Sequence, residues 1–454
     1  MLHQDRRHFL QLLSAGALGR LVAAPISRAL AAESAAASDD FFVFIHCSGG
    51  WDVTLWSDPR TTATSAIDPP STEFVDTARL RLWQDAPLDG TTKTFEPIVR
   101  GNLRFGPGIG GLVDFADRLT LINGVAMNTV SHPDGTYYSS TGRHLSGGRP
   151  VAPSADVCVA DALAGTQLFP VVSFRYPTAY VGSSLSPRCL PLQVDTVDTI
   201  AKSLLRAQTT TNETDRDAVN LMLSAEASTL LGSSALTTSL QGYKLQIETL
   251  RKMSGDSLGP LFSSSALKAA NFTPATYAGR FQGATAVNFS FAVEAMKRNA
   301  IRSISLTCGG FDTHNTNYRS HGENQQETFD LVASFLRALD GAPHPTKAGA
   351  KLTDHVHILI TSDFCRTPNI NTSGGRDHYP NNTSVIISPK FRGGTSFGSS
   401  RASDLLPQNS GTFADGPRPV APPDLLATLL SSAGIDPRRY LRDGEVVSAI
   451  LRAP

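Results

Sequence analysis

The sequence is poor in cysteine, has no excess of either charge and contains no long apolar run, and each shortage excludes a class of protein. Its 454 residues include five cysteines and no C-x-x-C pair, which excludes a zinc ribbon and a disulfide framework. Lysine plus arginine equals aspartate plus glutamate, at 40 each, so no basic surface for nucleic acid is predicted. With 41% hydrophobic and 18% charged residues, the chain is expected to fold as a globular protein.

The N-terminal segment has the three parts of an export signal. Arg6 and Arg7 precede a short apolar stretch, and the segment ends in "ALA" at 29–31, which has the A-x-A pattern of a cleavage site. The arginine pair followed by "HFL" resembles a twin-arginine signal, which implies export by the Tat machinery to the periplasm or the cell exterior. The apolar stretch is too short to predict a membrane span, although a retained anchor or an amphipathic first helix stays open. We expect a signal peptide over 1–31 and a linker over 32–38.

Apolar runs of strand length alternate with helical patterns in the rest of the chain. Runs that are apolar on both faces are typical of central parallel strands. Strands alternating with helices predict an α/β fold with a largely parallel sheet. The predicted strands lie within 41–47, 119–124, 300–314, 355–364 and 383–388, and the clearest helices within 286–300, 323–340 and 424–435.

Two segments depart from this alternation. Residues 195–285 show successive helical patterns without strands, so we expect a helical insertion on the body of a single domain over 39–454. Residues 389–423 are rich in glycine, serine and proline, which predicts an exposed loop or a small hairpin. No internal repeat of fixed period is present.

Acidic and histidine residues follow the predicted strands, where ligands collect in open α/β sheets. If the strands are parallel, these residues meet at one edge of the sheet. Carboxylates and imidazoles suit a divalent metal site, whereas each short motif taken singly is more often a turn. The set consists of Asp52, Ser131, His132, Asp312, His314, Asp363, Asp377 and His378.

Several motifs together resemble a large bacterial family of Tat-exported proteins of unknown function. The segment "SDFCRTPNINTSGGRDHYP" is similar to that family's "EFGRTP…GRDHWP" signature, and "GGFDTH" to its "GGWDTH" motif. "GGWD" near the start, "SHPDG" and the closing "RPVAPPDLLATLLSSAGIDP" match further segments of it. The family resembles the alkaline phosphatase and sulfatase superfamily, which implies a three-layer α/β/α sandwich around a mainly parallel sheet.

The resemblance implies a role for each matching residue. One or two divalent ions (Zn, Mn, Mg or Ca) are expected, and Ser131, with Thr129 behind it, is the candidate nucleophile. His132 is expected to act as an acid or base or as a further ligand. The implied metal ligands are Asp52, Asp312, His314, Asp363 and His378.

The chain also departs from the superfamily pattern. Phe364 stands where a metal-binding histidine is expected, which leaves one metal, or a second whose shell is completed by water or His132. The C-x-P-x-R motif is absent, so a formylglycine sulfatase is not expected. Arg366 and Arg376 are expected either to bind an anionic substrate or to pair with Asp363 or Asp377. Cys365 is expected to be structural.

Two functions stay open from sequence alone. The first is an exported metal-dependent hydrolase or transferase that acts on a small anionic phosphate- or sulfate-type ester through a serine nucleophile. The second is a non-catalytic exported protein that keeps the fold as a binding or assembly module for an unknown protein partner. The missing imidazole at Phe364 favours the second, and the full set of strand-end residues favours the first.

Overall fold

The computed structural model describes residues 38–60, 97–165, 167–182, 184–197, 261, 263–271 and 283–453. The predicted signal peptide lies outside the described residues, as does the linker except for residue 38. Most of the helical insertion predicted over 195–285 lies outside them as well.

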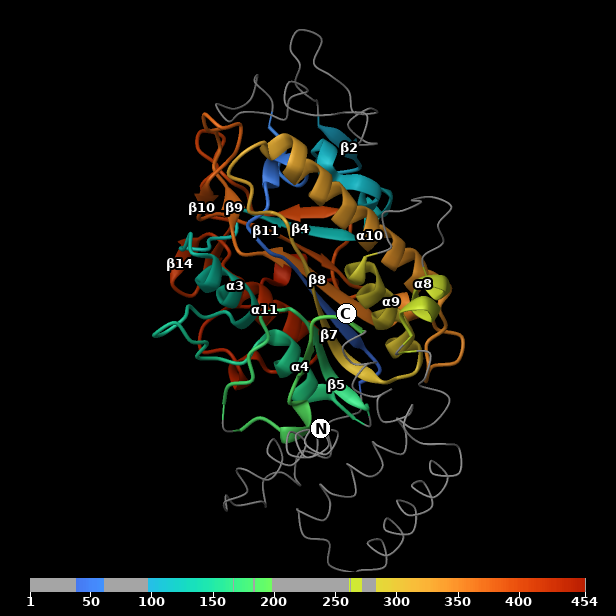
Figure 1. The fold of residues 1–454 in the computed structure, drawn as a ribbon. Coiled ribbons are helices and arrows are strands. Elements are labelled where there is room, and N and C mark those ends of the chain that lie inside the picture. Colours follow the sequence, from blue (N-terminus) through green and yellow to red (C-terminus); the bar gives the residue numbers. More distant parts are fainter. Residues whose placement is uncertain are drawn as a thin grey trace, which may run out of the picture.

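A central eight-stranded sheet organises the described residues (Figure 1). Its strand order is β12-β4-β11-β8-β1-β7-β5-β6. Every neighbouring pair is parallel except the two made by β11, which runs antiparallel to β4 and to β8. Seven strands therefore point the same way, and the C-terminal ends of β1, β4, β7 and β8 share one edge. The strands of this sheet are β1 (Phe41–Cys47), β4 (Leu119–Asn123), β5 (Phe169–Phe174), β6 (Leu192–Val194), β7 (Ile301–Cys308), β8 (Val356–Ser362), β11 (Thr383–Ile387) and β12 (Thr395–Phe397).

Helices cover both faces of the sheet, and the alternation within β1 shows why. Phe41, Val43 and Ile45 belong to a core shared with α9 and α10, whereas Phe42 and Phe44 belong to a second core shared with α3, α4 and α11. All of β1 is buried, so an apolar side chain at each position stabilises one core or the other. The three-layer α/β/α sandwich predicted from sequence is confirmed (Figure 1). The α-helices are α3 (His132–Thr141), α4 (Ala155–Leu163), α8 (Ser264–Asn271), α9 (Ala284–Lys297), α10 (Gly322–Gly341) and α11 (Pro422–Ser432).

Among the described residues, three small two-stranded sheets lie outside the central one. The glycine-rich segment 389–423 contains one of them, which confirms the predicted hairpin. Another joins the two sides of the segment that carries the "GGRDHYP" motif, with His378 opposite Arg366. The pairs are β2 (Ile98–Arg100) with β3 (Leu103–Phe105), β9 (Cys365–Arg366) with β10 (His378–Tyr379), and β13 (Gly411–Phe413) with β14 (Gly416–Arg418).

Two further observations concern the cysteines and the helices. All five cysteines are buried and unpaired, and burial raises the pKa of the Cys365 thiol, as expected of a structural residue. Among the described residues, none of the helices has the length and apolarity needed to cross a membrane.

Candidate metal centre

Three loops at the shared edge of the sheet bring the candidate residues together. His132 opens α3 after β4, and Asp312 and His314 follow β7. His378 lies in β10, in the segment that leaves β8 and returns to β11. Since β11 alone runs in the opposite direction, that segment starts and ends at the same edge. An isolated bridge between Asn315 and Gly374 joins two of the loops.

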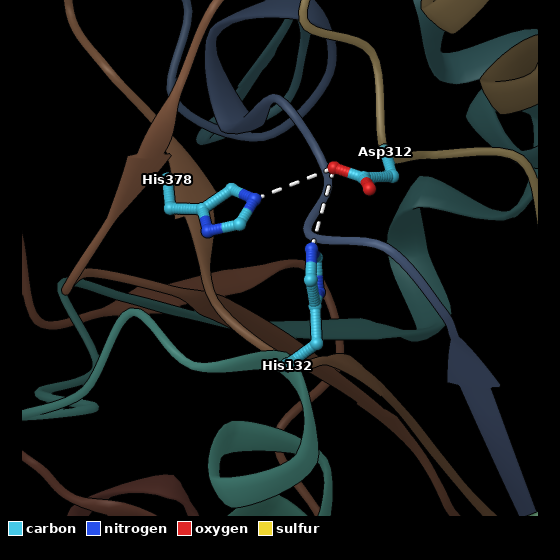
Figure 2. Close-up of side chains that lie close together, drawn as sticks. All are labelled: His132, Asp312 and His378. Atoms are coloured by element: carbon cyan, nitrogen blue, oxygen red, sulfur yellow. Dashed lines mark hydrogen bonds and ion pairs between the residues drawn. The ribbon is translucent and has the colours of Figure 1, made fainter.

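Three imidazole nitrogens converge on one carboxylate oxygen of Asp312. Its Oδ1 lies 3.3 Å from His132 Nε2, 3.0 Å from His314 Nε2 and 3.4 Å from His378 Nε2. His314 Nε2 and His378 Nε2 are 3.1 Å apart. Figure 2 shows two of the rings approaching Asp312 from different elements. About half of the Asp312 side chain is exposed, so the group is open to solvent.

These spacings fit a metal ion. Four ligands at the ~2.0–2.1 Å of Zn–N and Zn–O bonds stand about 3.3 Å from one another in a tetrahedron. The three Nε2 atoms lie 3.0 to 3.4 Å from Asp312 Oδ1, and those of His314 and His378 lie 3.1 Å apart. His132 Nε2 is buried and has no hydrogen-bond partner among the described residues, as expected of a lone pair kept for a ligand. Among the described residues, His132, Asp312 and His378 form a candidate metal-binding group whose ligand atoms all lie within 4.8 Å of one another, and His314 is not a member of that group.

Each of the three rings donates a hydrogen bond from its Nδ1 to a protein oxygen. His132 Nδ1 donates to Asp363 Oδ2 at 2.6 Å, and His314 Nδ1 donates to Asp377 Oδ1 at 2.7 Å. His378 Nδ1 donates to the Val130 carbonyl at 2.9 Å. Since a carboxylate or a carbonyl only accepts, each neutral ring carries its proton on Nδ1 and presents an Nε2 lone pair. Such outer partners are typical of metal-binding histidines.

The charges around the group favour a bound cation. The hydrogen bond to Asp363 raises the pKa of His132, and Asp312 adds to the effect. Burial alone would raise the pKa of Asp312, but Arg366 lowers it to about 2, so this carboxyl is ionised at neutral pH. Burial lowers the pKa of His378, which keeps that ring neutral and able to coordinate.

Asp363 lies behind the group rather than within it. Its side chain is 1% exposed, and its two oxygens contact His132 Nδ1, His46 Nε2 and the Gly49 amide. Burial opposes its ionisation, but the two histidines lower its pKa overall. The sequence predicted Asp363 as a metal ligand; its oxygens contact His132 and His46 instead, and a ligand role stays a prediction.

Asp52 is also separate from the group. It is fully buried, accepts hydrogen bonds from the Thr54 amide at 2.9 Å and from Asn317 Nδ2 at 2.7 Å, and pairs with Arg376. Its backbone amide donates to His321 Nε2 at 2.7 Å. Burial opposes ionisation, but Arg376 leads the interactions that lower its pKa. Protein groups therefore already contact both carboxylate oxygens of Asp52, which the sequence predicted as a metal ligand.

The two arginines predicted as substrate-binding residues are both fully buried. Arg366 donates to Asp312 Oδ1 at 2.7 Å and to the carbonyls of Gly49, Gly50, Phe311 and Arg376. Arg376 donates to the carbonyls of Thr367 and Pro368 and to the Tyr318 hydroxyl. Their acidic partners are Asp312 and Asp52, and not Asp363 or Asp377 as the sequence suggested. Substrate binding by either arginine stays a prediction.

Phe364 forms an apolar wall behind two of the imidazoles. Its ring centroid lies 4.7 Å from that of His132 and 4.7 Å from that of His378. The side chain is fully buried. The residue that departs from the superfamily pattern therefore packs against the candidate ligands.

Ser131 is the N-cap residue of α3, immediately before His132. It is exposed, and its hydroxyl makes no capping hydrogen bond to the helix. Its amide donates to Thr129 Oγ1 at 3.2 Å. This position at a helix N-terminus is the one that the sequence resemblance assigns to a nucleophile, and its role stays a prediction.

Three buried residues that support these networks were not predicted from sequence. His46 lies in a run that the sequence pattern indicates as an apolar strand, and its Nε2 lies 2.9 Å from Asp363 Oδ1. Asn317 and His321 lie beyond the "GGFDTH" motif. Asn317 donates a hydrogen bond to Asp52, and both residues are hydrogen-bonded to the Thr313 hydroxyl. A histidine inside an otherwise apolar strand was the available signal for His46, because buried polar side chains require partners.

Solved structures resemble the chain distantly. The lipoteichoic acid synthase LtaP from Listeria monocytogenes is 8% identical, with a TM-score of 0.37, over 88% of this chain and 73% of its own. Ps i-CgsB, in complex with k-i-k-neocarrahexaose, is 11% identical, with a TM-score of 0.37, over 89% and 74%. A putative sulfatase from Bacteroides thetaiotaomicron is 10% identical, with a TM-score of 0.34, over 91% and 75%. Similarities this weak transfer no activity.

Sequence comparison gives a firmer result. No curated protein matches the chain. The sequence model of one family matches residues 40–445, which is most of the chain and includes every candidate site residue. The chain therefore belongs to the family described as "Protein of unknown function (DUF1501)".

Proposed function

We propose that the protein is an exported, metal-dependent hydrolase or transferase that acts on phosphate- or sulfate-type esters. The observation that carries the proposal is the convergence of three imidazole Nε2 atoms on Asp312 Oδ1 in a group open to solvent. The ester class rests on the motif resemblance to the alkaline phosphatase and sulfatase superfamily. Export rests on the resemblance of the N-terminal segment to a twin-arginine signal.

One divalent ion per chain is the expected content. His132, Asp312 and His378 would hold it, since their ligand atoms all lie within 4.8 Å of one another, and His314 Nε2 lies 3.0 Å from Asp312 Oδ1 beside them. A group that contains two imidazoles favours zinc over magnesium or calcium, which prefer oxygen ligands. No second ion is expected, because Asp52 pairs with Arg376 and Asp363 is engaged by two histidines.

A bound divalent ion would supply Lewis acidity and lower the pKa of an oxygen nucleophile. The chain's own residues supply the rest. Ser131 offers an exposed hydroxyl beside the group, and the N-terminus of α3 favours a negatively charged substrate there. Arg366 holds Asp312 in place from the buried side. His314 and Asp377, both about half exposed, form the solvent side of the site.

A second function is favoured by a separate observation. Arg376 beside Asp52 and Phe364 in place of an imidazole remove ligands that the superfamily uses for a second cation. A non-catalytic binding or assembly protein that retains one structural metal would also have this arrangement.

Metal analysis and turnover on the same samples separate the two functions. The purified protein should contain about one equivalent of zinc or manganese and hydrolyse at least one member of a panel of phosphomonoesters, phosphodiesters and sulfate esters. Asp312→Ala and His378→Ala should lose both metal and turnover. His144→Ala is the matched control, because His144 pairs with Asp134 outside the group.

Each failure has a distinct meaning. Protein that contains metal but turns over nothing on the panel supports the non-catalytic function. Protein that contains no metal after reconstitution, and is inactive, overturns the proposal.

A further inference from the structure

The buried imidazole of His46 has no role in the centre described so far. His46 lies in β1, between β7 and β8, and is 1% exposed. Its Nε2 lies 2.9 Å from Asp363 Oδ1, although the angle falls short of a hydrogen bond in this conformation. Its Nδ1 has no hydrogen-bond partner among the described residues. Burying two ring nitrogens costs free energy, and Asp363 is the polar group close enough to offset it.

Asp363 connects His46 to the candidate ligand His132. Oδ1 of Asp363 faces His46, and Oδ2 accepts from His132 Nδ1 at 2.6 Å. The Gly49 amide lies 3.2 Å from both oxygens. The carboxylate is thus held from two sides, and its plane determines where the His132 ring points.

We infer that His46 is a positioning residue for the metal centre and acts through Asp363 on His132. With His46 in place, Oδ1 is occupied and Oδ2 stays on His132 Nδ1, so His132 Nε2 faces Asp312. Without it, the Gly49 amide and His132 alone hold the carboxylate, and the orientation of the His132 ring is less firmly fixed. The inference rests on the metal-binding half of the proposed function and not on the reaction.

Two substitutions separate positioning from packing. His46→Leu keeps an apolar volume in the strand and removes the nitrogen. His46→Gln keeps an N–H at nearly the position of Nε2. We expect His46→Leu to weaken Zn²⁺ or Co²⁺ binding by about 10- to 100-fold, the usual effect of losing an outer partner of a metal ligand, and His46→Gln to restore most of the affinity.

His357 provides a matched control. It is equally buried, lies in the adjacent strand β8 and contacts Ser388 and Asp40 away from the centre. His357→Leu should lower the stability of the fold and leave metal affinity unchanged. Affinity is measured by competition titration with a chromophoric chelator, and the geometry of the centre by the visible spectrum of the cobalt-loaded protein. Urea unfolding of each apo protein reports stability.

The outcomes are distinguishable. A folded His46→Leu protein with wild-type cobalt affinity and spectrum overturns the inference, as does a His46→Gln protein as weak as His46→Leu. If His46→Leu does not fold, His46→Asn, whose amide is too short to reach Asp363, replaces it. If the metal affinities follow the expected pattern but no variant turns over any ester, the proposed reaction is overturned and the inference about His46 is supported. A wild-type protein that binds neither metal overturns both.

Discussion

Arg376 and Asp52 form a fully buried ion pair, with Nε and Oδ2 3.2 Å apart and neither side chain reaching solvent. The guanidinium supplies positive charge at the carboxylate that the sequence predicted as a metal ligand. We expect Arg376→Met to lower the free energy of unfolding by about 3–5 kcal/mol, because it leaves a buried charge without its partner. Urea denaturation at pH 7 measures the change.

The same pair predicts how the metal content of Asp52 variants should behave. Adding Asp52→Asn to Arg376→Met should recover part of the lost stability, since the uncompensated charge is removed. Asp52→Asn alone should keep the wild-type metal content. Loss of metal from a folded Asp52→Asn protein would restore Asp52 as a ligand.

Replacing Phe364 by histidine tests whether the missing imidazole alone prevents a second metal site. The side chain is fully buried and packs against His132 and His378. A polar ring there should lower stability by about 1–3 kcal/mol. Metal stoichiometry should stay at the wild-type value, because Asp52 and Asp363 remain engaged. A second equivalent of metal in Phe364→His, measured by elemental analysis, would contradict this.

Gly375→Ala should separate the two loops that carry His314 and His378. A Cβ at Gly375 would lie 2.0 Å from the backbone carbon of His314 and 2.3 Å from the Asn315 nitrogen. We expect at least a tenfold loss of metal affinity together with a lower unfolding midpoint. Gly309→Ala is the matched control, since its Cβ would meet nothing within 4 Å. Equal metal affinities in the two variants would argue against close contact of the loops.

His321 should make stability depend on pH. Burial lowers its pKa to about 3, from an ordinary value of 6.5, so the folded state holds it neutral. The contribution of His321 to the free energy of unfolding is therefore fully present above pH 6.5, where this histidine is also neutral in the unfolded chain. It is lost progressively as the pH falls from 6.5 toward 3, by up to about 1.4 kcal/mol per pH unit.

His321→Gln isolates this contribution. An amide can still accept from the Asp52 amide, which donates to His321 Nε2 at 2.7 Å, but it does not titrate. The variant should be less stable than the wild type at pH 7 and should lose less stability between pH 7 and pH 5. Urea denaturation at both values measures the difference. Parallel stability curves for the two proteins would disprove the assignment.

Export is tested by replacing Arg6 and Arg7 with lysine. If the N-terminal segment is a twin-arginine signal, the paired substitution should leave the protein in the cytoplasm, as seen by cell fractionation and immunoblotting. Replacing Arg20 alone, which lies outside the pair, is the control. Normal export of the paired variant would count against the signal.

The sequence predicted the sheet and the positions of the loops well, for a physical reason. Continuous apolar runs identified β1, β4, β7, β8 and β11, because strands buried on both faces carry few polar residues. The antiparallel direction of β11 was not predicted, since its apolar pattern is the same in either direction. The strands β5, β6 and β12 were missed, two of them being three residues long.

The candidate site was predicted less completely than the fold. The motifs indicated Asp312, His314 and His378, and His132 was raised as a further ligand. Spacing along the chain does not indicate which carboxylates pair with an arginine or a histidine of another loop and are therefore not available to a metal. The partners of Asp52 and Asp363 come from other loops, and Asp363 meets His132 across 231 positions of sequence.

The convergence on Asp312 has a practical consequence for experiments on folding. The ligand atoms of the candidate centre come from the loop after β4, the loop after β7 and the segment before β11. Asp312 and His378 are 66 positions apart in the sequence. No fragment that lacks one of these loops can assemble the shell. The absorption band of a cobalt ion at this centre would therefore serve as an optical probe of tertiary structure. Its loss during denaturation would mark the point at which the edge of the sheet comes apart.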